Sequence, residues 1–192
     1  MKQKRRCVWP GEDQLMVRYH DREWGVPLHN DRKLFEFMVL DAFQAGLSWR
    51  TILHKRTNFE KGFDNFDPTI IARYSPTKIK KLLTDAGIIR NRLKINGTVK
   101  NAKAYLALKK KHGSFSKFLW QFTGGKPKVN YWKNEKQIPA RSRESDAMSE
   151  ALKKAGFTFV GSTICYAFMQ AAGMVNDHVV DCPRWKYCHK EK

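Results

Sequence analysis

Apolar and polar residues alternate with the period of an α-helix over most of the chain. From Leu34 to Ala42 the apolar residues recur every three or four positions and form one stripe. This pattern predicts a helix that begins at a capping residue, Asn30 or Asp31, and runs to about Gln44.

Capping residues and prolines mark further helices along the chain. These are expected at about 49–55, from Asp67-Pro68 onward, at about 76–83, 91–111 and 115–122, from Ser145 to 156, and at 161–173. Residues 123–144 are rich in glycine, proline and scattered charge, which predicts a linker or surface loop. The best strand candidate, Phe157–Val160, is short. The pattern therefore favours an all-α chain.

Length and composition limit what this chain can be. Its 192 residues fit one domain, 1–192, and 42% hydrophobic residues are too many for a disordered chain. There are 37 Lys and Arg against 18 Asp and Glu, a formal net charge of +19. Such an excess attracts a polyanion, so nucleic acid is the first candidate partner. An anionic membrane surface is the second.

The sequence gives no sign of export or of membrane insertion. The basic N-terminus is followed by Trp-Pro-Gly-Glu-Asp instead of an apolar run, so we expect no secretory signal. The longest apolar stretch, 163–175, is too short to span a bilayer and predicts a buried helix. We therefore expect a soluble, cytoplasmic protein.

A Cys/His pair lies near each end of the chain. These pairs are Cys7 with His20, and His178 with Cys182. Together they would supply the four N/S ligands of a structural zinc and join the two ends. Their spacing is not that of a standard zinc finger, so buried thiols and surface imidazoles are an equal alternative. The neighbouring pair Cys188-His189 is a competing source of ligands.

A tight break between two helices is predicted at 84–90. Gly87 would turn the chain, and a basic helix carrying Arg90, Arg92 and Lys94 follows directly. A hairpin of this kind, at about 77–100, can present backbone N–H groups to a DNA phosphate without contacting bases. The alternative is an ordinary packing joint with a solvated basic face.

Aromatic residues and one carboxylate gather in the first quarter of the chain. They are Trp9, Tyr19, Trp24, Asp41 and Trp49. Aromatic faces attract a cation, and a carboxylate can accept a hydrogen bond from an exocyclic amine, so the group fits a pocket for a flat cationic base. The alternative is that the tryptophans are core residues and that Asp41 is a solvated helix position.

Several longer motifs run in order through the chain. They are Cys7-Val-Trp9, Tyr19-His20-Asp-x-Glu-Trp-Gly-Val-Pro27, Phe43-Gln-Ala-Gly-Leu-Ser-Trp49, Asp85-Ala-Gly-Ile-Ile-Arg90, Gly156-Phe-x-Phe-Val-Gly161, Thr163-Ile-Cys-Tyr166, Met169-Gln-Ala171 and Val175-Asn-Asp-His-Val-Val180. Together they closely resemble the 3-methyladenine DNA glycosylase I family, and the resemblance covers essentially the whole chain.

The resemblance implies a helix-hairpin-helix glycosylase fold and a set of functional residues. The implied ligands of a structural zinc are Cys7, His20, His178 and Cys182. The implied base pocket is formed by Trp9, Tyr19, Trp49 and the carboxylate of Asp41, supported by Trp24. The implied DNA contacts are Gln44, Gly46 and Leu47, which would wedge the duplex, with Gly87, Arg90 and Arg92 of the hairpin.

Position 41 departs from the family pattern, in which we expect Glu. The Asp41 side chain is one methylene shorter, so its carboxylate would fall about 1.5 Å short of the expected place. A bridging water or a slight helix shift would restore the contact.

The implied activity is hydrolysis of the N-glycosidic bond of 3-methyladenine in alkylated double-stranded DNA. The base is flipped into the pocket, Asp41 and Tyr19 contact its edge, and water traps the sugar cation. No lysine is placed to form a Schiff base, so we expect a monofunctional enzyme that leaves an abasic site. One lesion pocket per chain requires no partner, so we expect a monomer. The competing hypothesis is a zinc-containing DNA-binding protein without catalysis; RNA-binding and membrane-surface roles have only the charge in their favour.

Overall fold

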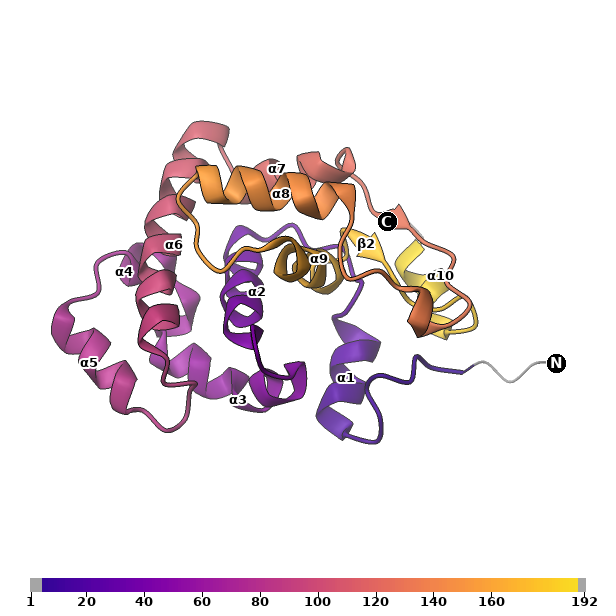
Figure 1. Cartoon of the computed structure of the whole chain (residues 1–192), viewed down its shortest axis with the longest axis horizontal. Helices are drawn as coiled ribbons and strands as arrows, with labels where there is room; N and C mark the ends of the chain where they lie inside the picture. Colours follow the sequence, from indigo (N-terminus) through magenta and orange to yellow (C-terminus); the bar gives the residue numbers. More distant parts are fainter. Residues whose placement is uncertain (1–4, 190–192) are drawn as a thin grey trace.

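The computed structural model describes residues 5–189, and the chain is mostly helical (Figure 1). The α-helices in this range are α1 (Gln14–Arg22), α2 (Asp31–Gln44), α3 (Trp49–Gly62), α4 (Pro68–Ile71), α5 (Pro76–Thr84), α6 (Arg92–His112), α7 (Phe115–Trp120), α8 (Arg143–Lys154), α9 (Ser162–Ala171) and α10 (Pro183–His189). Short 3₁₀ turns are η1 (Asp64–Phe66), η2 (Gln121–Thr123) and η3 (Glu135–Gln137). The predominance of helix was predicted from the sequence.

The predicted helix starts are confirmed where a capping side chain marks them. Asn30 accepts a hydrogen bond from the backbone N–H of Lys33 and begins α2. Ser75 caps α5, whose first residue is Pro76, and Asn91 caps α6. Each cap satisfies a backbone N–H that has no partner within the helix.

Several element boundaries differ from the sequence prediction. Helix α3 runs to Gly62 instead of Lys55, because fully buried Phe59 holds a further turn against the core. Helix α8 is capped by Ser142, and Ser145 completes a capping box inside its first turn. Helices α1 and α10 were not predicted at all.

The strand candidate of the sequence was wrong, and the structure contains one short strand pair that was not predicted. Phe157–Val160 is not a strand, and Phe159 adopts a left-handed backbone conformation with φ +59°. Instead, β1 (Lys128–Val129) pairs in parallel with β2 (Val175–Asn176), which departs from an all-α chain. The stretch 123–144 is otherwise a loop as predicted, and β1 and η3 lie within it.

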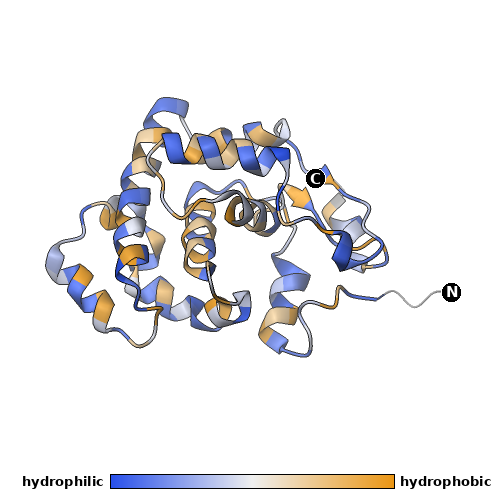
Figure 2. Ribbon diagram, viewed as in Figure 1, coloured by the Kyte–Doolittle hydropathy of each residue, from blue (hydrophilic) through white to orange (hydrophobic). Residues whose placement is uncertain are grey.

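Helix α2 is the centre of the core. Its ten consecutive residues 34–43 are all buried, because α3, α6, α7 and α9 pack around it. Figure 2 shows hydrophobic residues along α2 and many hydrophilic residues on the helices that surround it. Of the helices in residues 5–189, none combines the length and apolar character that crossing a bilayer requires. The basic residues 1–4 lie outside the described range.

The two ends of the described chain meet on one side of the molecule. The segment before α1 lies beside the segment that links β2 to α10, as seen in Figure 1. The turn 45–48 joins the C-terminal end of α2 to the N-terminal end of α3. This arrangement brings the predicted pocket residues and the predicted metal ligands into two neighbouring clusters.

Candidate active site and metal centre

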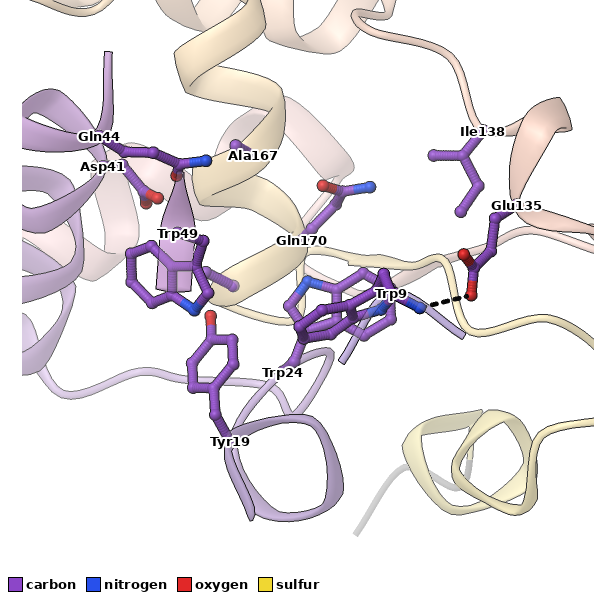
Figure 3. Close-up of a pocket in the computed structure, with 11 residues that line it drawn as sticks. Trp9, Tyr19, Trp24, Asp41, Gln44, Trp49, Glu135, Ile138, Ala167 and Gln170 are labelled. Carbon is purple, nitrogen blue, oxygen red and sulfur yellow. Dashed lines mark hydrogen bonds between the residues drawn. The ribbon is translucent and has the colours of Figure 1, made fainter. Parts of the chain in front are cut away.

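A cavity of about 350 Å³ opens between α1, α2, α3 and α9 (Figure 3). Its lining residues are Trp9, Tyr19, Trp24, Asp41, Gln44, Trp49, Glu135, Ile138, Ala167, Gln170 and Ala171. The volume falls at the lower end of small-molecule sites, which span about 300–1,000 Å³. All members of the predicted aromatic and carboxylate cluster lie in this wall.

The aromatic rings meet edge to face or tilted instead of stacking on one another. The ring centroids of Trp9 and Trp24 are 5.1 Å apart at an interplanar angle of 67°, and those of Tyr19 and Trp49 are 5.0 Å apart at 45°. Tyr19 and Trp24 are buried, whereas Trp9 and Trp49 are only partly buried. Trp9 and Trp49 therefore keep surface available to a ligand in the cavity, and the simple core interpretation does not account for them.

Three polar atoms in this wall are buried without a hydrogen-bond partner among the described residues. They are Nε1 of Trp9, Nε1 of Trp49 and Oδ2 of Asp41. Buried polar atoms in folded proteins are nearly always paired, and leaving one unpaired costs free energy. The wall of this cavity therefore offers two donors and one acceptor to a polar ligand.

Burial governs the ionisation of the two acidic groups here. Asp41 is 2% exposed, and desolvation raises its pKa well above the usual value. The pKa of Tyr19 is also raised well above its usual value, first by desolvation and then by the charge of Asp41. A cationic ligand beside Asp41 would favour its charged form, because opposite charges stabilise each other strongly in a dry cavity.

The loop 123–144 contributes to the cavity, which the sequence analysis did not predict. Glu135 accepts hydrogen bonds from the backbone N–H groups of Val8 and Trp9 through Oε1. The contact ties the backbone of Trp9 to this loop, as the dashed line in Figure 3 shows. A glutamate in a charge-rich loop carries no sequence signal of such a role.

The turn between α2 and α3 lies at the edge of the cavity. Gln44 lines the wall, Gly46 has φ +79°, and Leu47 is 43% exposed. Ser48 caps α3 and so fixes the direction in which Trp49 leaves the turn. The turn therefore holds an exposed apolar side chain outside the core.

The predicted break between α5 and α6 is present and tightly braced. The backbone N–H of Gly87 donates to Asp85 at 2.7 Å, and Lys55 donates to the carbonyl of Ala86 at 3.1 Å. A Cβ at Gly87 would lie 2.9 Å from Asp85 Oδ1, which excludes a larger residue without rearrangement. Arg90 and Arg92 are exposed and make no ion pair with any described residue.

The four Cys and His side chains predicted as a metal site form one buried cluster. Their candidate ligand atoms all lie within 4.8 Å of one another. Nδ1 of His178 is 3.2 Å from Nε2 of His20, and the sulfur of Cys182 is 3.7 Å from each of these nitrogens. Cys188 is buried outside this cluster, and the side chain of His189 lies outside the described part of the chain.

The cluster geometry fits a tetrahedral metal ion. Ligands at about 2.0 Å (nitrogen) and 2.3 Å (sulfur) from a common centre would be about 3.3–3.8 Å apart, and the three contacts given above, at 3.2 and 3.7 Å, lie close to this range. Nδ1 of His20 is 2.7 Å from Asp21, and Nε2 of His178 is 3.0 Å from the carbonyl of Trp24. These contacts place the ring protons away from the centre and leave the facing nitrogens free to bind a metal.

The pKa of Cys182 is also consistent with a metal site. The hydrogen bond from Cys7 lowers the pKa of Cys182, and the two histidines lower it further, whereas the same contact raises the pKa of Cys7. A thiolate is the form of cysteine that binds metals. The cluster is therefore a buried Cys/His site able to hold a metal ion.

Comparisons with known proteins agree on one family. The family model of methyladenine glycosylase matches residues 9–185. The DNA-3-methyladenine glycosylase 1 of Escherichia coli (strain K12) is 49% identical over 92% of this chain and 95% of its own, and the DNA-3-methyladenine glycosylase of Haemophilus influenzae is 47% identical over 93% and 96%.

Solved structures give the same result. A crystal structure of 3-methyladenine DNA glycosylase I has a TM-score of 0.91 at 47% identity, covering 93% of this chain and 98% of that one. A crystal structure of a variant of 3-methyladenine DNA glycosylase I in complex with 3-methyladenine has a TM-score of 0.90 at 35% identity, covering 92% and 95%. The chain belongs to the methyladenine glycosylase family.

Proposed function

We propose that this protein is a DNA repair glycosylase that hydrolyses the N-glycosidic bond of 3-methyladenine in alkylated double-stranded DNA. The observation that carries the proposal is the aromatic cavity with its three unpaired polar atoms, among them Asp41 Oδ2. The similarity to proteins named DNA-3-methyladenine glycosylase supports it over the entire fold. The chain would act as one domain.

In this proposal the cavity binds the flipped base. The face of the base lies against Trp9 and Trp49, and Trp24 supports Trp9 from the edge. Asp41 and Tyr19 contact the edge of the base, where the exocyclic amine offers hydrogen bonds. A methyl group at N3 makes the adenine ring cationic, so aromatic faces and a carboxylate both favour it over a neutral base.

Little further chemical assistance is required, because the cationic base is already a good leaving group. The bond between C1′ and N9 breaks, the base departs as neutral 3-methyladenine, and water adds to C1′ and releases a proton. Asp177 does not serve as a general base in this account, because four donors already occupy its oxygens. The product is an abasic site, without cleavage of the strand.

Two surface features would hold the DNA. The segment 77–100 forms a helix-hairpin-helix whose turn at Gly87 binds a phosphate, with Arg90 and Arg92 supplying positive charge. The turn with Gln44, Gly46 and Leu47 enters the duplex where the base leaves the stack. The two features adjoin each other, since Lys94 at the start of α6 donates to the carbonyl of Ala45.

The Cys/His cluster would hold a structural zinc ion. Cys7, His20, His178 and Cys182 supply four ligands, and such a closed site leaves no position for a catalytic water. The ion would join the N-terminal segment that carries Trp9 to the C-terminal segment. A zinc ion here supplies no step of the reaction.

The proposal is tested by the product released from methylated duplex DNA. We expect purified monomeric protein to release free 3-methyladenine, resolved by chromatography, and to leave strands that break only after alkali treatment. Strand cleavage without alkali would contradict the monofunctional assignment. A well-folded protein that binds duplex DNA and releases no base would instead support the non-catalytic DNA-binding role.

A further inference from the structure

Gln170 is a polar side chain on a wall of the cavity that is otherwise formed by small apolar residues of α9. Its neighbours in this wall are Ala167 and Ala171. The side-chain amide donates from Nε2 to Oδ2 of Asp177 at 2.8 Å. The oxygen of the same amide, Oε1, makes no hydrogen bond to any residue in the range 5–189. The proposed mechanism does not use this oxygen.

Asp177 fixes which end of the Gln170 amide faces the cavity. The carboxylate is 1% exposed and accepts a hydrogen bond from Tyr166 Oη at 2.8 Å on the same oxygen that Gln170 contacts. Its other oxygen accepts from Asn130 and from Trp132, each at 2.7 Å. A flipped amide would place an oxygen against a buried carboxylate, which is electrostatically unfavourable.

The consequence is a hydrogen-bond acceptor of fixed direction inside the cavity. Figure 3 shows the oxygen of Gln170 directed towards the side from which Asp41 projects, while the nitrogen is directed away. Helices α2 and α9, which carry these two residues, pack directly against each other. A ligand between these two helices meets the carboxylate of Asp41 on one side and the amide oxygen of Gln170 on the other.

The geometry points to Gln170 as a specificity-determining residue that accepts a hydrogen bond from the exocyclic amine of a 6-aminopurine. This inference rests on the proposed glycosylase function. The amine of adenine carries two N–H groups, and Asp41 and Gln170 supply one acceptor each. A 6-oxopurine such as guanine presents O6 there, so two acceptors would face each other without a proton between them.

Asp177 is a positioning residue in this scheme. It does not touch the base, and it acts by holding the Gln170 amide in one orientation. Preorganisation of this kind is what makes an acceptor discriminate, because an amide free to rotate would offer its N–H₂ group to O6 and accept either base.

The test compares the release of 3-methyladenine and 3-methylguanine from the same methylated DNA. The variant is Gln170→Met, which keeps the size of the side chain and removes the acceptor. The matched control is Tyr166→Phe, which removes another donor to Asp177 and leaves Gln170 in place. Circular dichroism and duplex affinity establish that both proteins are folded.

We expect Gln170→Met to lower kcat/KM for 3-methyladenine by about 10- to 100-fold, leaving kcat/KM for 3-methylguanine unchanged or higher. Tyr166→Phe should keep the wild-type ratio of the two values. Equal loss for both bases, or no loss for either, would overturn the inference and leave the proposed function intact. A wild-type protein that releases neither base would overturn both.

A second measurement does not depend on the Gln170 variant. Free 3-methyladenine and its 6-oxo counterpart, 3-methylhypoxanthine, compete with methylated DNA for the cavity of wild type and of Asp41→Ala. Because Gln170 remains in Asp41→Ala, that variant should still prefer the 6-amino base by about tenfold. Loss of the whole preference in Asp41→Ala would assign the discrimination to Asp41 alone and overturn the inference.

Discussion

The ammonium group of Lys94 joins the first turn of α6 to the end of α2 by donating to the carbonyl of Phe43 at 2.8 Å. It donates also to the carbonyl of Ala45 at 2.6 Å, and the side chain is buried. One charged group therefore connects the proposed DNA-binding hairpin to the turn that carries Gln44 and Leu47. Carbonyl groups at the end of a helix have no partner within it, so a cation satisfies them well.

Replacing Lys94 with Met should destabilise the protein by about 2 kcal/mol and reduce base release from duplex DNA. The reason is that two carbonyls lose their donors and the turn 45–48 loses its anchor. Thermal unfolding and single-turnover excision measure the two effects. Lys103→Met, at an exposed position of α6, is the control and should change neither. Wild-type stability in Lys94→Met would contradict this role.

The raised pKa of Asp41 makes a prediction about stability and pH. The unfolded carboxyl loses its proton near pH 4, whereas the buried group keeps it to higher pH, so the folded state binds more protons in between. Stability of the wild type should therefore fall as pH rises above about 4 and level off above the raised pKa.

Asp41→Asn removes this dependence, since an amide does not titrate. The variant should be more stable than wild type near pH 7, by about 1 kcal/mol, and the difference should shrink as pH approaches 4. Thermal unfolding of both proteins from pH 4 to 8 gives the comparison. A difference that is constant over this range would show that burial does not perturb Asp41.

The buried Cys/His cluster predicts a metal-dependent stability. Elemental analysis should give one zinc per chain, and Cys182→Ser should lose the ion and lower Tm by about 10 °C or more. Cys165→Ala is the control, because Cys165 is buried away from the cluster and should keep the metal. Gently purified wild-type protein without zinc would contradict the assignment.

The hairpin predicts how salt affects DNA binding. Arg90→Ala and Arg92→Ala should each weaken binding to undamaged duplex and reduce the slope of log Kd against log salt by about 1, since each removes one phosphate contact. Lys110 lies towards the other end of α6, so Lys110→Ala should leave the slope unchanged. If all three variants kept the wild-type slope, the DNA would not contact the hairpin.

Much of the fold could be predicted because its helices begin at residues with a local chemical signature. Asp67 and Ser75 are predicted caps and Asn30 is one of two candidates, and the structure confirms all three. The end of α3 could not be predicted, because Phe59 stands among polar residues and is buried only by contacts distant in sequence. Tertiary packing overrides local pattern at such positions.

Some residues of the candidate site could be predicted from the sequence, and others could not. The aromatic cluster and the Cys/His cluster were hypotheses from residue types that left alternatives open, and the family resemblance selected their members. Glu135 could not be predicted, since its contact to Trp9 joins residues 126 positions apart through a loop. Gln170 offered a weak signal, a polar residue within an otherwise apolar helix, and only the structure shows that it faces the cavity.

The most direct test of the account compares wild type and Asp41→Asn side by side. Release of 3-methyladenine from methylated duplex DNA and affinity for undamaged duplex are measured on the same preparations. We expect the variant to lose base release by about 100-fold or more, because the carboxylate contacts only the flipped base, and to keep its duplex affinity within about twofold. An equal fall in both quantities, or undiminished base release, would contradict the assignment of this cavity as the active site.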